Sequence, residues 1–217
     1  MKTINKEISQ ESIDILSKEI KGYTTMQYFL KRVTDFLISI PLFIFSLPVS
    51  IYSIYRIKKE SPDGPIFFKQ QRVGRDGKEF TCYKFRSMIP EAEKNGIPKF
   101  ASNNEPRIFK WGALSRIDEL PQLLNVFKGD MHLIGPRAEC SELVKEYEQK
   151  IPNYHLRHIV APGITGWAQV NYPYGRNIED TKKKLEYDLY YIKNWSLWLE
   201  FKTIIKTILV VLGKKGL

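Results

Sequence analysis

The chain has 217 residues, and its 34 lysine and arginine residues outnumber its 24 aspartate and glutamate residues, giving a net charge of +10. An apolar content of 43% can offset the entropy of ordering the chain, which excludes disorder throughout, and a single long uncharged run excludes a membrane protein with many spans. The excess positive charge favours an anionic partner: a nucleotide, a nucleic acid or the anionic cytoplasmic leaflet of a membrane.

Residues 1–30 are predicted to be an N-terminal leader. The first 25 residues carry both signs of charge and no apolar core, a composition unlike that of a secretory signal. Their isoleucines are compatible with a loose amphipathic helix, and a frayed leader fits the same pattern equally well.

Residues 31–60 are predicted to form a hydrophobic membrane helix. Residues 36–55 are an uncharged run of 20, just long enough to span a bilayer. Pro41 and Pro48 interrupt the run, and each removes a backbone donor. The expected donors to the carbonyls freed by these prolines are four serines: Ser39, Ser46, Ser50 and Ser53.

Basic residues flank this run on both sides. Because such residues favour the cytoplasmic side, both ends obey this preference only if the segment enters the membrane, bends near Pro48 and returns. We therefore expect a re-entrant helix with its membrane break at Pro48. A straight transmembrane helix and a buried helix of a soluble protein are the alternatives.

Residues 61–217 are predicted to be a cytoplasmic domain that begins with a short β-hairpin. A cluster of breakers at residues 61–65 separates it from the membrane helix. Strands are expected at residues 66–72 and 79–86, because Asp76-Gly77 between them is a favoured hairpin turn.

Lys84 and Arg86 lie two residues apart on the second expected strand. Alternate residues of a strand face the same side, so the two cations are expected to project together. Such a pair is suited to binding a diphosphate. A solvated strand face is the alternative interpretation.

Two adjacent carboxylates stand before an apolar stretch that ends at Gly129. Asp118 is a favoured helix N-cap residue, and Pro121 is tolerated in a first turn. Asp118 and Glu119 are therefore expected at a helix start, where the helix dipole keeps a carboxylate ionised. An ionised carboxylate suits a metal ligand or a nucleophile. A capping aspartate beside an exposed glutamate is the alternative.

The remaining pattern predicts a turn at Gly135-Pro136-Arg137 that presents Arg137 to a phosphate, with a plain turn as the alternative. Residues 160–171 contain two glycines and one tryptophan, typical of a loop or tight turn. Helices are expected at residues 139–150, 180–195 and 195–212. The last of these is amphipathic, with Glu200, Lys202 and Lys206 on its polar side. It is predicted to lie at a membrane interface, with packing on the core as the alternative.

Several blocks of sequence now point to a known family. They are the KR-x-x-D motif of Lys31, Arg32 and Asp35, and four longer stretches, FFKQQRVGRDGKEFTCYKFRSM, RIDELPQLLNVFKGDMHLIGPRAE, LRHIVAPGITGWAQVN and YDLYYIKNWSLWLEFKTIIKTILVVL. In this content and order, residues 31–212 closely resemble the bacterial sugar transferases, the monotopic phosphoglycosyl transferases.

The resemblance implies an α+β fold: a small monotopic membrane protein with an N-terminal re-entrant helix, a β-hairpin and several partly interfacial helices. It implies transfer of a sugar 1-phosphate from a UDP-sugar donor to undecaprenyl phosphate, with release of UMP and a requirement for Mg²⁺. This reaction is the first membrane step in the assembly of capsule, exopolysaccharide, lipopolysaccharide O-antigen or glycoprotein glycans. The implied location is the cytoplasmic face of the bacterial inner membrane, and a homodimer is left open.

The resemblance also implies residue roles. Asp118 is the expected nucleophile, which forms a covalent phosphosugar intermediate and contacts Mg²⁺, and Glu119 assists it. The expected phosphate-binding residues are Lys84, Arg86, Arg116 and Arg137.

The sequence departs from the family at three places. Leu47-Pro48 replaces the Ser-Pro pair often found at the break. The segment before the adjacent carboxylates Asp118 and Glu119, called the dyad below, is shortened and retains only Arg116. The Pro-Arg-Pro motif reads Pro136-Arg137-Ala138, so a less rigid turn is expected.

A different class of function remains as the alternative: a basic, non-catalytic scaffold at the membrane surface within a glycan assembly complex. A nucleic-acid binder is not expected, because the basic residues are dispersed and a membrane run is present.

Overall fold

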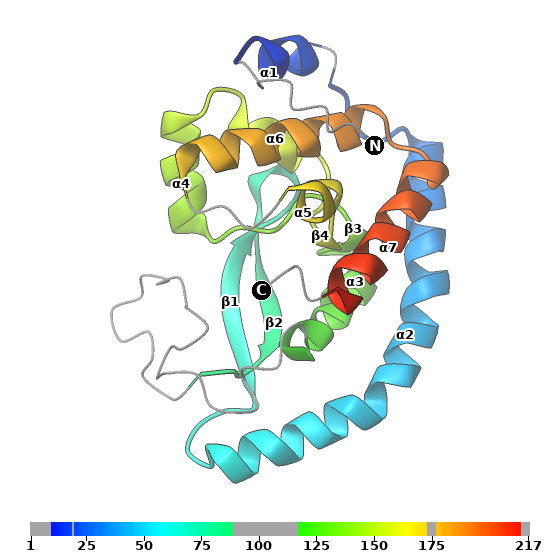
Figure 1. Ribbon diagram of the computed structural model, residues 1–217, viewed down its shortest axis with the longest axis vertical. Coiled ribbons are helices and arrows are strands. Elements are labelled where there is room, and N and C mark those ends of the chain that lie inside the picture. Colours follow the sequence, from blue (N-terminus) through cyan, green and yellow to red (C-terminus); the bar gives the residue numbers. More distant parts are fainter. Residues whose placement is uncertain (1–9, 19, 89–116, 173–176, 214–217) are drawn as a thin grey trace.

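A computed structural model describes residues 10–18, 20–88, 117–172 and 177–213 (Figure 1). Its described part combines helices with two small two-stranded sheets, which confirms the α+β class. In chain order the elements are α1 (Gln10–Ser17), α2 (Thr25–Glu60), β1 (Phe67–Val73), η1 (Arg75–Gly77), β2 (Glu79–Phe85), η2 (Ile117–Gln122), α3 (Leu123–Lys128), β3 (His132–Ile134), α4 (Ser141–Lys150), η3 (Tyr154–Ile159), β4 (Gly163–Thr165), α5 (Trp167–Asn171), α6 (Ile178–Lys193) and α7 (Leu197–Leu212).

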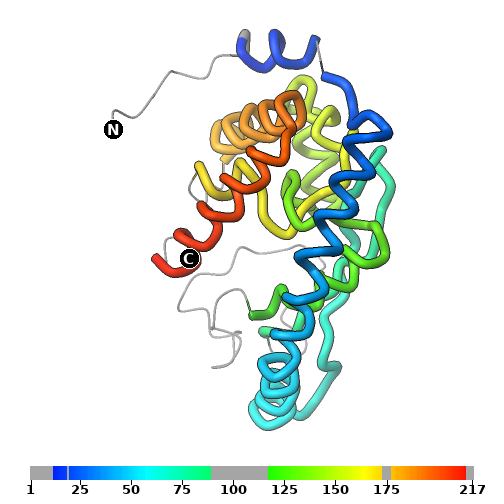
Figure 2. The backbone as a smooth tube through the Cα atoms, turned by 90° about the vertical axis from the view of Figure 1, so that its right-hand side faces the viewer, coloured from blue at the N-terminus to red at the C-terminus, as the bar shows by residue number. Residues whose placement is uncertain are grey.

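The hydrophobic helix α2 has 36 residues and runs almost the whole length of the molecule (Figures 1 and 2). It begins at Thr25, six residues before the expected boundary, because Thr24 and Gln27 form a capping box there. It ends at Glu60, where the breaker cluster begins, as predicted.

Helix α2 is apolar on the outside and polar on the inside. Five of its six buried residues are polar or charged, and only Ile57 is apolar. Only 17% of its most apolar window is buried. A helix in the core of a soluble protein buries its apolar stripe and exposes its polar one, so this arrangement is unlike that alternative.

The helix bends about midway (Figure 1). Prolines are the common cause of such kinks, and α2 contains Pro41 and Pro48. Ser46 and Ser53 bond to helix carbonyls, those of Phe43 and Val49. Neither is the carbonyl four residues before a proline, so these serines do not take over the missing backbone bonds as we had expected.

The β1–β2 hairpin forms where it was predicted. The strands are antiparallel, with Phe67 opposite Phe85 and Val73 opposite Glu79. The turn contains Asp76 at φ 57° and Gly77 at φ 73°. These are left-handed backbone conformations that glycine and aspartate tolerate better than most residues.

The second sheet pairs β3 with β4 in parallel, so that His132 lies opposite Gly163 and Ile134 opposite Thr165. The stretch 160–171, expected to be a loop or tight turn, therefore contains a strand and the short helix α5. A methyl group on Gly163 would lie 2.1 Å from the backbone nitrogen of Gly135. Only glycine permits so close an approach of two backbones.

The helices α4, α6 and α7 form close to their predicted positions. Leu185, Leu189 and Ile192 of α6 are buried, as their helical spacing indicated. Helix α1 packs on α6 through the buried Ile13, so this part of the N-terminal leader belongs to the folded body.

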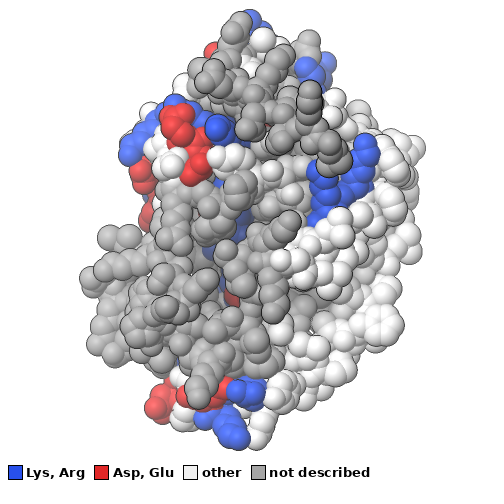
Figure 3. Space-filling model, viewed as in Figure 1, with Lys and Arg blue, Asp and Glu red and all other residues white. Residues whose placement is uncertain are grey.

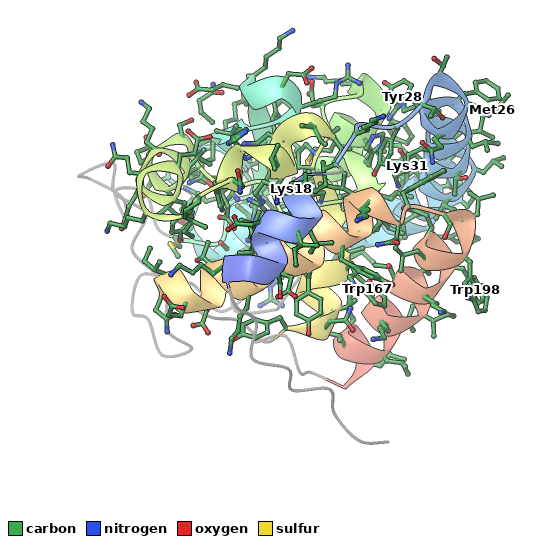
Figure 4. The ribbon with its side chains drawn as sticks, turned by 90° about the horizontal axis from the view of Figure 1, so that it is seen from above. Lys18, Met26, Tyr28, Lys31, Trp167 and Trp198 are labelled. Atoms are coloured by element: carbon green, nitrogen blue, oxygen red, sulfur yellow. The ribbon has the colours of Figure 1, made fainter. Side chains whose placement is uncertain are left out.

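Helix α7 begins beside the start of α2, where Glu200 contacts Lys31, and then diverges from it (Figure 2). Both helices carry exposed apolar residues. Trp198 and Met26 lie at the outer edge (Figure 4) and are 61% and 65% exposed. The surface over α2 and the neighbouring part of α7 carries few charged side chains (Figure 3). An apolar face of this extent is typical of a membrane or protein contact.

Candidate active site

The adjacent carboxylates Asp118 and Glu119 lie in η2, a 3-10 helix that runs directly into α3. The sequence predicted a single α-helix with Asp118 at its N-cap, and this detail is wrong. Asp118 is the second residue of a tighter 3-10 turn, in which successive side chains point about 120° apart. The two carboxylates therefore still point in different directions.

Glu119 lies between two cations. Its Oε1 is 3.1 Å from Lys84 Nζ and 3.9 Å from Arg137 Nη1. Lys84 Nζ also lies 4.0 Å from Asp118 Oδ2. The structure thus brings together four predicted site residues from β2, η2 and the turn after β3.

A cleft lies beside this group, and part of its lining is basic. Burial raises the pKa of the Cys82 thiol on its wall, so this side chain is a neutral neighbour rather than a nucleophile. The described lining residues are Arg72, Cys82, Lys84, Glu119, Gln122, Met131, Arg137, Ala138, Gly163 and Ile164.

Arg86 does not join Lys84 at this cleft. Its backbone N–H still donates to the Ile66 carbonyl at 2.9 Å, but its side chain turns toward the segment after α2 instead of lying beside Lys84. Its guanidinium is buried and donates hydrogen bonds to the carbonyls of Ser61 and Asp63, just after α2. Arg86 thus holds the chain just after α2 against the hairpin. Arg116, the other predicted phosphate ligand, lies outside the described residues.

Asn125 was missed by the sequence analysis and fixes the position of the dyad. Its side chain is fully buried, accepts from the N–H of Tyr83 at 3.1 Å and donates to the carbonyl of Thr81 at 2.7 Å. It thereby bonds α3 to the backbone of β2 as a neighbouring strand would. A lone asparagine inside an apolar helical stretch was the available signal.

Both halves of α2 contact the continuous segment of η2 and α3, which contains the dyad. Phe127 of α3 packs against Phe36 and Phe43, at centroid distances of 6.1 and 5.6 Å. Ile117 and Leu120 of η2 pack in one cluster with Ile57, beyond Pro48. The dyad is therefore mounted on the inner side of the bent helix.

A buried polar network joins the start of α2 to α7 and to β3. Lys31 Nζ lies 2.6 Å from Glu200 Oε2, and Asp35 accepts from the N–H of Leu133 at 3.0 Å. Asp35 Oδ2 also lies 2.5 Å from His132 Nδ1, and burial lowers the pKa of His132. A neutral His132 donating to Asp35 satisfies this geometry.

This network places two charged residues in the interior. Lys31, one of the basic residues before the uncharged run, lies inside, between α2 and α7 (Figure 4). Glu200, expected on the polar side of the last helix, is 2% exposed and also accepts from Trp195 Nε1 at 3.0 Å.

Comparison with known proteins identifies the family. The sequence profile of the bacterial sugar transferases matches residues 26–214. The chain therefore belongs to the bacterial sugar transferase family.

Individual relatives have known or assigned activities. The chain is 47% identical over 194 residues to a UDP-N-acetylgalactosamine-undecaprenyl-phosphate N-acetylgalactosaminephosphotransferase of Aeromonas hydrophila, covering 87% of this chain and 45% of that protein. It is 38% identical over 211 residues to a UDP-glucose:undecaprenyl-phosphate glucose-1-phosphate transferase of Xanthomonas campestris pv. campestris, covering 94% and 43%. It is 42% identical over 193 residues to EpsL, an uncharacterized sugar transferase of Bacillus subtilis, covering 87% and 90%.

The chain thus spans less than half the length of the first two relatives and nearly the whole of the third. The named relatives also differ in the sugar they transfer, so the similarity does not select one sugar.

Proposed function

We propose that this protein transfers a sugar 1-phosphate from a UDP-sugar to undecaprenyl phosphate, with Asp118 as the nucleophile. The observation that carries the proposal is the pairing of the two carboxylates with Lys84 and Arg137 at a cleft on the inner side of a membrane-type helix. The relatives that act on UDP-sugars and undecaprenyl phosphate support the substrate classes.

The proposed reaction has two displacements at one phosphorus atom. An Asp118 carboxylate oxygen attacks the phosphorus that bears the sugar, the bond to the bridging oxygen breaks, and UMP leaves with the electron pair. An oxygen of undecaprenyl phosphate then attacks the same phosphorus and expels Asp118. The carboxylate is restored, and no net proton transfer is needed.

Lys84 and Arg137 oppose the charge repulsion in this scheme. A carboxylate that approaches a diphosphate meets negative charge, and cations already fixed at the site stabilise the transition state without reorganisation. Glu119, at 3.1 Å from Lys84, holds that ammonium in place. We assign Glu119 to positioning.

The proposal includes Mg²⁺, and the described residues fit it. No group of three or more His, Cys, Asp or Glu side chains gathers in the described ranges, so they form no all-protein cage. Mg²⁺ is commonly held by one or two carboxylates together with substrate phosphates and water. Asp118, beside the cleft, is the carboxylate we assign to it. When bound, Mg²⁺ would neutralise phosphoryl oxygens and assist departure of UMP.

We place the protein on the cytoplasmic face of the bacterial inner membrane, with α2 re-entrant. A helix of 36 residues is about 54 Å long, well over the ~30 Å of a bilayer core. Both of its ends contact the same folded body, through Lys31 with Glu200 and through Ser61 with Arg86. A straight transmembrane helix would place its ends on opposite sides, whereas a bent one returns and presents the dyad to a lipid phosphate at the surface.

The test is intact mass spectrometry of detergent-purified protein. The wild-type protein is incubated with Mg²⁺ and a panel of UDP-sugars, without a lipid acceptor, beside Asp118→Asn. We expect a mass gain of one sugar phosphate in the wild type only, released on addition of undecaprenyl phosphate. The donor that gives the adduct names the sugar.

Two other outcomes would change the proposal. UMP release only in the presence of undecaprenyl phosphate, with no adduct at any time, would favour direct transfer. Neither adduct nor UMP under any condition would favour the non-catalytic scaffold.

A further inference from the structure

The turn that carries Arg137 is held at four consecutive carbonyls by three separate elements. The Pro136 carbonyl accepts from the N–H of Gly163 at 2.9 Å, and the Glu139 carbonyl accepts from the N–H of Val73 at 3.0 Å. Two arginine side chains donate hydrogen bonds to the two carbonyls that lie between these. Arg157 Nη2 donates to the Arg137 carbonyl at 3.0 Å, and Arg72 Nη1 donates to the Ala138 carbonyl.

Arg157 is itself rigidly held. It is 5% exposed, its Nε and Nη2 donate to Asp188 Oδ2 at 3.0 and 2.7 Å, and its Nη1 donates to the Tyr154 hydroxyl at 2.9 Å. One guanidinium thus ties α6 and η3 to the backbone of Arg137. A lysine cannot make the same contacts. The guanidinium has three nitrogens spaced apart in one plane, whereas an ammonium has a single nitrogen.

Arg72 lies on the other side of the same turn. Its Nε donates to Gln70 Oε1 at 3.0 Å, which fixes the guanidinium along β1. The backbones of Arg72 and Cys140 also form an isolated bridge, so β1 supports the segment just beyond the turn.

We infer that Arg72 and Arg157 are positioning residues that hold the Arg137 side chain at the phosphate-binding cleft; the inference rests on the proposed function. In this chain Ala138 follows Arg137, and the two arginines supply rigidity that a proline at that position would otherwise give. The Arg137 guanidinium must meet a phosphate within a fraction of an ångström, because small misplacements in an active site cost large factors in rate.

The first test is a double-mutant cycle on kcat/KM for UMP release. Arg157→Lys should lower kcat/KM about tenfold, and Arg137→Ala should lower it about a hundredfold. If Arg157 acts through Arg137, the double variant should be no worse than Arg137→Ala alone, within about threefold. Losses that multiply in the double variant would overturn the inference.

Tyr154→Phe is the matched control. It removes one partner of Arg157 but leaves the contact with the Arg137 carbonyl, so it should lower the melting temperature with kcat/KM changed by less than about threefold. An equal loss of kcat/KM in Tyr154→Phe and Arg157→Lys would indicate general loosening and would also overturn the inference.

A proline rescue tests Arg72 and covers the case in which Arg157→Lys fails to fold. Arg137 is bridged to Gly163, and the Pro-Arg-Pro motif of the family carries a proline at the position of Ala138. Arg72→Gln should lower kcat/KM about tenfold when residue 138 is alanine and less than about threefold in an Ala138→Pro background. An equal loss in both backgrounds would count against the inference.

The wild-type protein separates this inference from the proposed function. If the wild-type protein releases no UMP and does not bind UDP by calorimetry, the proposed function fails and the inference fails with it. If the wild-type protein is active but the cycle is multiplicative, only the inference fails.

Discussion

The Lys31 ammonium lies 2.6 Å from Glu200 Oε2, and the two side chains are 0% and 2% exposed. Lys31 also lies 3.4 Å from Asp35, one helical turn further along α2. The first turns of α2 are therefore joined to α7 by a desolvated ion pair. Removing one partner of such a pair leaves an uncompensated charge in the interior.

We predict that Lys31→Met lowers the free energy of unfolding by about 3–5 kcal/mol. The double variant Lys31→Met/Glu200→Gln should lose less than Lys31→Met alone, because the buried Glu200 charge is then removed together with its partner. Thermal unfolding in one detergent measures both. Lys58→Met, an exposed lysine near the other end of α2, is the matched control and should change stability by less than about 0.5 kcal/mol. A loss in Lys31→Met no larger than in this control would contradict the assignment.

Lys84 and Arg86 should separate into a catalytic and a structural residue. Lys84→Gln removes the cation beside Asp118 and Glu119 and should lower kcat by about 10²–10³ with little change in melting temperature. Arg86→Gln leaves the carbonyls of Ser61 and Asp63 without their donor and should mainly lower the melting temperature. The measurement is kcat alongside thermal unfolding. A comparable loss of kcat in both variants would restore the sequence-based prediction that the two residues bind phosphate together.

Gly163→Ala should prevent the two sheet strands from reaching their present separation. The added methyl group would lie 2.1 Å from the Gly135 nitrogen and 2.5 Å from the Thr165 carbonyl oxygen, both backbone atoms that cannot move aside alone. We expect a loss above about 4 kcal/mol or no folded protein, judged by limited proteolysis. Gly22→Ala, whose methyl group would meet only one atom at 3.6 Å, is the control and should fold normally.

Stability should fall as the pH is lowered below about 6.5. Burial and the neighbouring Arg157 lower the pKa of His158 to about 3, and burial lowers that of His132. Below the ordinary histidine pKa the unfolded chain therefore binds more protons than the folded one, so acid favours unfolding. For His158 this continues down to about pH 3, at up to about 1.4 kcal/mol per pH unit.

Melting temperatures between pH 7.5 and 5 test this dependence. The wild type should lose stability steadily, and His158→Gln should show a shallower slope over the same range. Equal slopes in the two proteins would show that His158 is not held neutral in the folded state.

Local patterns predicted the local elements well. Alternating residues around Asp76-Gly77 identified the hairpin, and the spacing of Leu185, Leu189 and Ile192 identified α6. The turn at Arg137 was predicted because glycine and proline favour turns, glycine by allowing unusual backbone angles and proline by fixing φ. These signals operate over a few residues, so a sequence contains them in full.

Contacts between distant residues were beyond such reasoning. The burial of Lys31 could not be predicted because its partner lies 169 positions away, and Glu200 was placed on the polar side of the last helix for the same reason. Arg86 was placed beside Lys84 because nothing in the sequence marks the carbonyls of Ser61 and Asp63 as partners of its side chain. Asp118 and Glu119 lie at a helix start, as expected, but an N-cap pattern does not distinguish a 3-10 start from an α-helical one.

The separation of Lys31 and Glu200 also sets an order of events during synthesis. At about 5–20 residues per second, Glu200 is made roughly 10–30 s after Lys31, and α2 is complete long before then. During that interval Asp35 is the one network carboxylate already made that can neutralise Lys31. Helix α2 thus acquires its final attachment only when α7 folds against it, which makes the folding of the last helix the step that completes the buried network.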